Sequence, residues 1–188
     1  MYDSLKMLGV APDGDTIDRS EITAVLERAR VEFHGMLLAA QRNDAWTKPT
    51  RGTRWNNEQL LFHMVFGYMV VLRLLILVHL LGRLPEPVSR VFARVLNAAT
   101  TPFHPINYYG SCAAALVYNR RRMGAKLDRV IASINRKLAK DSDEALRRGM
   151  HFPTGWDPFF ADYMTLEDVY RYPSRHFDFH AQQLTLVA

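Results

Sequence analysis

The sequence predicts an all-α protein, a four-helix bundle with an extra short connecting helix. Two observations carry this prediction. Apolar residues recur at three- and four-residue steps over several long stretches, and no stretch alternates between apolar and polar residues in the manner of a half-buried strand. With 188 residues, of which 48% are hydrophobic and 23% charged, the chain suits a single globular domain over residues 1–188.

The first helix is expected to start after an N-cap at Thr16 or Asp18 and to end near Gln41. Its apolar stripe consists of Ile22, Val25, Leu26, Ala29, Phe33, Met36, Leu37 and Ala40. The second helix is expected to run to about Leu81 from an N-cap at Asn56, which Gln59 complements in a capping box.

The second helix is apolar almost all round, so a membrane span is the competing interpretation. From Met64 to Leu81 the apolar run is broken only by Gly67, Arg73 and His79. However, Arg73 would sit near the bilayer centre, which costs about 2.5–3.5 kcal/mol, and no second span would shelter it. A central helix packed on several sides explains the same pattern, and we expect no membrane partner.

The rest of the chain supplies the connecting helix and two further long helices. A short amphipathic piece lies between Leu84 and Pro105, where Pro102 and Pro105 predict an irregular crossing. The third helix is expected over 106–140, weakened at two glycines. The fourth is expected from a capping box at Thr165 to about Leu184, kinked or split by Pro173.

Cysteine and histidine counts limit the metal chemistry. The single cysteine, Cys112, excludes an internal disulfide and any zinc site that needs two or more cysteines, whereas seven histidines are available.

The N-terminus has no basic segment followed by a long apolar run, so it does not indicate a secretory signal. We therefore expect a cytoplasmic protein.

The positive charge is concentrated in one segment. Between Asn119 and Arg148, ten basic residues stand against four acidic ones, a net +6, although the whole chain carries only +5. Such a segment could contact an anionic partner, but it has no helix-turn-helix or zinc-finger spacing. We interpret it as the solvated face of a helix and expect no nucleic-acid partner.

Two histidines of the fourth helix, His176 and His180, are four residues apart and so lie on nearly the same helix face. Both imidazoles can then reach one ion, but a metal site needs a third ligand from another element. The pattern leaves five candidates open, with a slight preference for His63, where a buried imidazole would need a use for its lone pair. They are His34, His63, His79, His104 and His151.

A resemblance to a known family narrows this choice. The segment Trp55-Asn-Asn-Glu-Gln-Leu-Leu-Phe-His63, followed downstream by Met164-Thr-Leu-Glu-Asp-Val and by His176-x-x-x-His180-Ala-Gln-Gln-Leu184, resembles the DinB/YfiT-like family of helical-bundle metalloproteins. The resemblance covers essentially the whole chain in the order of its elements. It implies that His63, His176 and His180 bind a divalent metal. His104, in the long connection, is a weaker candidate for a fourth ligand.

Three neutral histidines leave an open coordination position, as in catalytic zinc sites, and would also accept nickel or iron. The resemblance implies a low-molecular-weight-thiol-dependent transferase or isomerase, or a metal-dependent hydrolase, acting on a small molecule as a homodimer. Because Cys112 is alone, we expect any thiol to arrive as a cosubstrate. A noncatalytic metal-binding or stress-response bundle is the alternative.

Aromatic residues are expected to border such a site. Tyr172 lies one turn before His176, Trp156 belongs to an aromatic, proline-rich loop, and Tyr108 opens the expected third helix beside Tyr109. We predict that Tyr108, Trp156 and Tyr172 contribute to substrate binding, although aromatics in such positions often serve packing instead.

Overall fold

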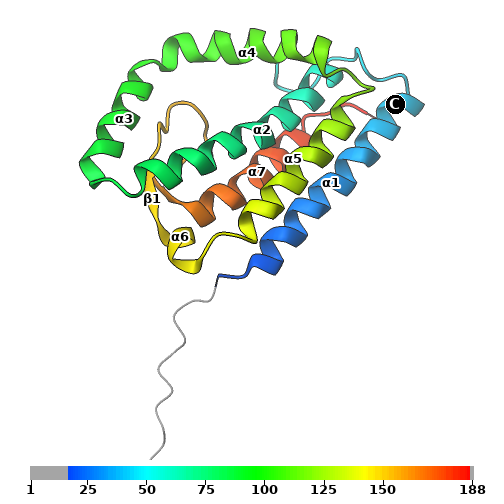
Figure 1. Ribbon diagram of the computed structural model, residues 1–188. Coiled ribbons are helices and arrows are strands. Elements are labelled where there is room, and N and C mark those ends of the chain that lie inside the picture. Colours follow the sequence, from blue (N-terminus) through cyan, green and yellow to red (C-terminus); the bar gives the residue numbers. More distant parts are fainter. Residues whose placement is uncertain (1–16, 187–188) are drawn as a thin grey trace, which may run out of the picture.

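The computed structural model describes residues 17–186 (Figure 1). Seven helices and two short strands follow one another in this range, so the all-α prediction is confirmed. In chain order they are α1 (Arg19–Arg42), α2 (Asn57–Leu81), α3 (Glu86–Ala98), α4 (Thr100–Val117), α5 (Met123–Leu138), α6 (Asp143–Arg147), β1 (Gly149–His151), β2 (Tyr163–Thr165) and α7 (Leu166–Ala181).

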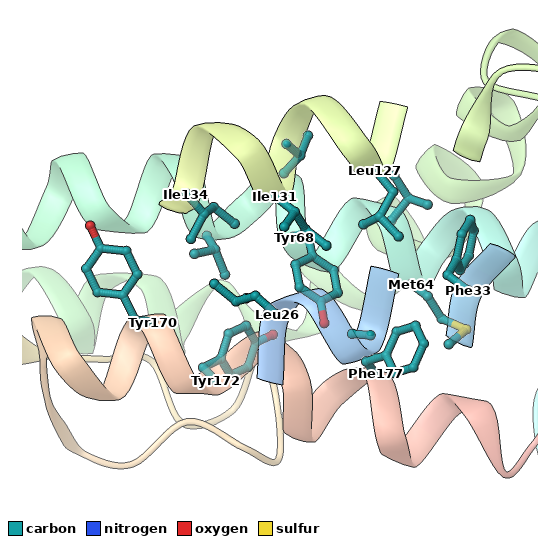
Figure 2. Close-up of a cluster of buried hydrophobic side chains, with 14 of the residues drawn as sticks. Leu26, Phe33, Met64, Tyr68, Leu127, Ile131, Ile134, Tyr170, Tyr172 and Phe177 are labelled. Atoms are coloured by element: carbon teal, nitrogen blue, oxygen red, sulfur yellow. The ribbon is translucent and has the colours of Figure 1, made fainter. Parts of the chain in front are cut away.

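Four long helices, α1, α2, α5 and α7, enclose the hydrophobic core. Helix α2 packs against α7, α5 and α4, while α1 packs against α5 and α7. Figure 2 shows how side chains from these four helices interdigitate. Figure 1 shows α3 and α4 forming an arch along one side of α2. The sequence predicted this connection only from Leu84 to Pro105, whereas the arch extends to Val117.

The predicted starts of the first, second and fourth helices are confirmed. The Asp18 side chain caps α1 by accepting the backbone N–H of Glu21, whereas Thr16 lies outside the described residues. Asn56 and Gln59 form the capping box of α2. Thr165 and Asp168 form the corresponding box at α7, so short-range side-chain chemistry sets the start of these three helices.

The predicted third helix is wrong as a single element. The chain leaves α4 at Val117, turns through 118–122 and begins α5 at Met123. Asn119 holds the turn by accepting the backbone N–H of Arg121 on its side chain, and Glu58 of α2 accepts the backbone N–H of Arg120. These side chains offer the backbone partners outside a helix, which ends it without any proline.

Pro102 and Pro105 do not produce the expected irregular crossing, because both lie inside α4. Pro102 occupies the first turn, where backbone N–H groups have no partner within the helix. Pro105 lies one turn further and removes a single backbone hydrogen bond. The connection is therefore two consecutive helices, α3 and α4, of which α3 is the predicted connecting helix.

The C-terminal part differs from prediction in smaller ways. Helix α6 and the antiparallel pair β1–β2, in which Met150 lies opposite Met164, were not predicted. Helix α7 ends at Ala181, short of Leu184, and runs through Pro173 without the split that was one expectation. Buried side chains on both sides of Pro173, among them Val169 and Phe177, anchor the two halves of α7 in the core.

Helix α2 explains the most ambiguous stretch of the sequence. By length and composition alone it could cross a membrane. In this structure one side of α2 contributes Leu60, Met64 and Leu75 to the core. A second side faces the α3–α4 arch and lines a cavity described below. Packing on two sides accounts for much of the apolar pattern, although Ile76 and Leu80 of the same helix are exposed.

Candidate metal centre

Helix α7 brings His176 and His180 together. The two residues lie one turn apart on the buried face of the helix, and their ring centroids are 4.5 Å apart. The capping box at Thr165 starts α7 at a defined residue and so sets which residues face α2. The i,i+4 spacing thus produces the shared face that the sequence predicted.

The third histidine comes from α2. His63 lies 5.1 Å from His176 and 4.9 Å from His180, measured between ring centroids. One ring nitrogen from each of the three residues lies within 4.8 Å of the other two. All three side chains are at most 8% exposed. The structure therefore gathers the three predicted ligands at the contact between α2 and α7.

Hydrogen bonds orient two of the three rings. Nδ1 of His180 lies 2.7 Å from Oε1 of Gln183, a carbonyl oxygen that accepts a hydrogen bond from the ring N–H. Nδ1 of His63 lies 3.1 Å from the Ser111 hydroxyl on α4. Because Oε1 can only accept, Nδ1 of His180 is protonated and its Nε2 carries the free lone pair, whereas the Ser111 hydroxyl can donate to or accept from His63. Outer hydrogen bonds of this kind typically fix the tautomer of metal-binding histidines.

Burial keeps the three imidazoles neutral. Desolvation, reinforced by the neighbouring His180, lowers the pKa of His63 to about 3. Burial likewise lowers the pKa of His176 well below its usual value, with further lowering from His63 and His180. The pKa of His180 is also lowered by burial, partly opposed by its bond to Gln183. At neutral pH all three present lone pairs without releasing protons.

Tight packing fixes His176. The residue of α2 that faces it is Gly67, and a Cβ at that position would lie 2.8 Å from Nδ1 of His176. This Nδ1 is buried and has no hydrogen-bond partner among the described residues. An unpaired buried nitrogen is costly, and a cation bound by the three rings would relieve the crowding of their lone pairs. The donor set therefore fits a divalent metal.

The other four histidines lie elsewhere. His34 binds Asp128, His79 pairs with Asp141, and His151 contacts Glu86 and Asp162. His104 is exposed on α4 beside Phe103 and is not part of the three-histidine cluster. The prediction of His104 as a weaker fourth ligand finds no support in this geometry.

A cavity of about 450 Å³ opens beside the three histidines. His63 and His176 form part of its wall, and apolar side chains from α2, α3, α4 and the 152–160 loop form most of the rest. Asp157 also lines it, with Oδ2 3.9 Å from Nε2 of His176. Because His176 is neutral, this contact is not an ion pair. It places a carboxylate beside one of the three clustered histidine rings.

The predicted substrate-binding residues differ in their positions. Tyr172 lines the cavity, and its hydroxyl donates to Asp157 over 2.7 Å. Burial raises the pKa of Tyr172, so the hydroxyl remains a donor at all ordinary pH values. Trp156 also lines the cavity. Tyr108 does not line it and stacks instead on Trp55, which in turn stacks on His63.

Several residues of the site were not predicted from the sequence. The contact between His180 and Gln183 could have been predicted, because residues three apart lie close together on a helix or its last turn. No local sequence pattern predicts the roles of Ser111, Asp157 and Gly67. Each reaches the site through contacts between elements that are distant in the chain.

Comparisons with known proteins give no independent identification of this centre. The chain matches no family model, no curated protein and no solved structure. The assignment of the three histidines therefore rests on their geometry and on the sequence resemblance stated above.

Proposed function

We propose that this chain is a divalent-metal-dependent enzyme of the DinB/YfiT-like four-helix-bundle type, in which His63, His176 and His180 hold one ion. The observation that carries the proposal is the convergence of three buried, neutral imidazoles within 4.8 Å of one another. Burying three such rings together disfavours the metal-free fold, so a structural purpose without a cation is a poor explanation. Zinc, nickel and iron all suit this donor set.

Three neutral ligands leave the charge of the ion uncompensated and at least one coordination position open. A metal held by these residues would lower the pKa of a bound thiol or water and so supply a nucleophile at neutral pH. The carboxylate of Asp157, beside His176, would serve as a proton acceptor in such a reaction. Its other oxygen accepts the backbone N–H of Phe159, and Tyr172 holds the oxygen near His176, so the carboxylate is oriented from two sides.

A thiol-dependent transfer or isomerisation is the reaction class that we favour. Cys112 lies half-buried on α4 and does not belong to the three-histidine cluster. We therefore propose that the nucleophilic sulfur comes from a low-molecular-weight cosubstrate. An apolar cavity beside the cluster accommodates a soft, weakly hydrated thiolate more readily than hydroxide. Cytoplasmic location and a homodimer remain predictions from the sequence.

Metal content tests the first part of the proposal. Untagged wild-type protein is expected to contain about one divalent ion per chain by elemental analysis. His180→Ala should lose that ion, whereas His34→Ala should keep it, because His34 binds Asp128 outside the cluster. Equal metal content in the two variants, or background content in the wild type, would overturn the assignment.

Spectroscopy with cobalt tests the thiol. Cobalt-loaded protein titrated with low-molecular-weight thiols should develop a sulfur-to-metal charge-transfer band that the His180→Ala protein lacks. Hydrolysis of esters or amides without such a band would replace the transferase with a hydrolase. Metal that raises thermal stability, with no charge-transfer band and no turnover, would identify the noncatalytic alternative.

A further inference from the structure

The cavity extends along α2, away from the histidines. Its α2 wall consists of residues three and four positions apart, which form a single stripe along the helix. At 1.5 Å per residue, the stripe from His63 to Leu77 covers about 21 Å of helix axis. The cavity is therefore elongated, with the candidate metal position at one end. The stripe consists of His63, Phe66, Gly67, Val70, Leu74 and Leu77.

The opposite wall is held in place by specific contacts. Nε1 of Trp156 donates to the backbone carbonyl of Leu96 over 2.7 Å, which ties the 152–160 loop to α3. The Trp156 ring stacks on Phe103 of α4 at 4.2 Å between centroids. The backbone N–H of Gly155 donates to Asn97. These bonds keep the cavity open without an occupant, as expected of a preformed ligand site.

Polar groups gather at the histidine end. Asp157 lies beside His176. Asn107 also lines the cavity and lies on α4 one turn before Ser111, the residue that contacts His63. The far end is lined by Leu74, Leu77 and the residues that face them from α3 and β1. A volume of about 450 Å³ falls within the range of small-molecule sites, about 300–1,000 Å³.

We propose that the substrate is an elongated small molecule with an apolar body along α2 and a polar head at the three histidines, bound to the metal as an anion. The apolar walls recognise the body by excluding water from it. The anionic head compensates the charge left by three neutral ligands. The assignment of the head rests on the proposed function, whereas the binding of the body rests on the cavity alone.

A chain-length series tests this substrate class. Straight-chain alkyl carboxylates and alkanethiols of increasing length are titrated into zinc-loaded protein and into metal-free protein by calorimetry. Burying each added methylene should strengthen binding about fourfold until the cavity is full, after which affinity should level off. This slope should be the same with and without zinc. The zinc-loaded protein should bind every member more tightly by a constant factor.

Two variants locate the body in the cavity. Leu74→Trp fills the middle of the α2 stripe, so affinity should stop increasing at a shorter ligand chain. Leu77→Ala deepens the far end of the cavity, so affinity should continue to increase to a longer ligand chain. Leu80→Trp is the control, because Leu80 is 60% exposed on the same helix and does not line the cavity. It should follow the wild type.

The outcomes separate the two proposals. If the length dependence is present but zinc adds nothing, the apolar site stands and the metal function fails. If zinc binds and affinity is independent of chain length in the wild type, the inference about the apolar body is overturned and the metal function stands. Identical length dependence in Leu74→Trp, Leu77→Ala and wild-type proteins would also overturn it.

Discussion

Replacing Gly67 with alanine would push a methyl group into His176. The added Cβ would lie 2.8 Å from Nδ1 and 3.0 Å from Cε1 of the ring, whereas ordinary contacts begin near 3.4 Å. The ring must therefore retreat by about 0.6 Å. Metal–ligand distances tolerate about 0.2 Å, so the displacement exceeds what a bound ion accommodates. We expect Gly67→Ala to weaken zinc binding by about 10- to 100-fold, the range found for disturbed ligand orientation.

Stability of the metal-free protein should change much less. Alanine in place of glycine inside a helix stabilises by about 0.5–1 kcal/mol, while overpacking a tight site costs about 1–3 kcal/mol. The net loss should be about 1 kcal/mol, small enough for the variant to fold. Competition with a chromophoric zinc chelator measures the affinity, and urea titration of the metal-free protein measures the stability.

Two other glycine positions provide controls. Gly35→Ala meets no atom within 4 Å and should stabilise α1 without changing zinc affinity. Gly124→Ala places its Cβ 3.0 Å from the ring of His34, a comparable clash with a histidine outside the cluster. It should lose stability and keep zinc affinity. Wild-type zinc affinity in Gly67→Ala, or equal losses in Gly67→Ala and Gly124→Ala, would refute the reasoning.

Two further predictions concern the partners and protonation of the histidines. Ser111→Ala and Gln183→Leu should each weaken zinc binding by about tenfold, because they remove the groups that orient His63 and His180. Ser133→Ala is the control in the same chelator assay, because the Ser133 hydroxyl donates to the Arg129 carbonyl of its own helix. The metal-free protein should lose stability as the pH falls below about 6.5, the pKa of a histidine in the unfolded chain. Below this pH the unfolded chain binds protons at its histidines, whereas burial in the folded protein lowers the pKa of His63 to about 3. Urea titrations should therefore show an unfolding midpoint that decreases from pH 7.5 to pH 5. This decrease should be smaller in a His63→Gln variant. A midpoint that is independent of pH would contradict the burial argument.

The helices whose ends depend on neighbouring residues were predictable. Capping boxes at Asn56 and Thr165 act over three residues, so their effect is written in the local sequence and the structure reproduces it. The break between α4 and α5 was not predictable in this way. Part of the turn at Asn119 depends on Glu58, which lies 62 residues from its partner Arg120 along the chain.

Helix α4 also shows why apolar periodicity misled the prediction of a continuous third helix. The clean stripe of Met123 to Leu138 belongs to α5 and faces the core. Helix α4 contributes little to that core and leaves Ile106 and Leu116 exposed. A stripe indicates that a segment is helical, but it does not show that two adjacent segments share one axis.

The sequence by itself determined the all-α class, the helix caps and the pairing of His176 with His180, because each depends on residues within one turn of each other. The local pattern left five candidates for the third histidine, and the family resemblance pointed to His63; the packing of α2 on α7 is what brings His63 to that pair. Tertiary structure also brought Asp157, Ser111 and the apolar cavity to the same place. These contacts join segments separated by tens of residues, and no local pattern encodes them.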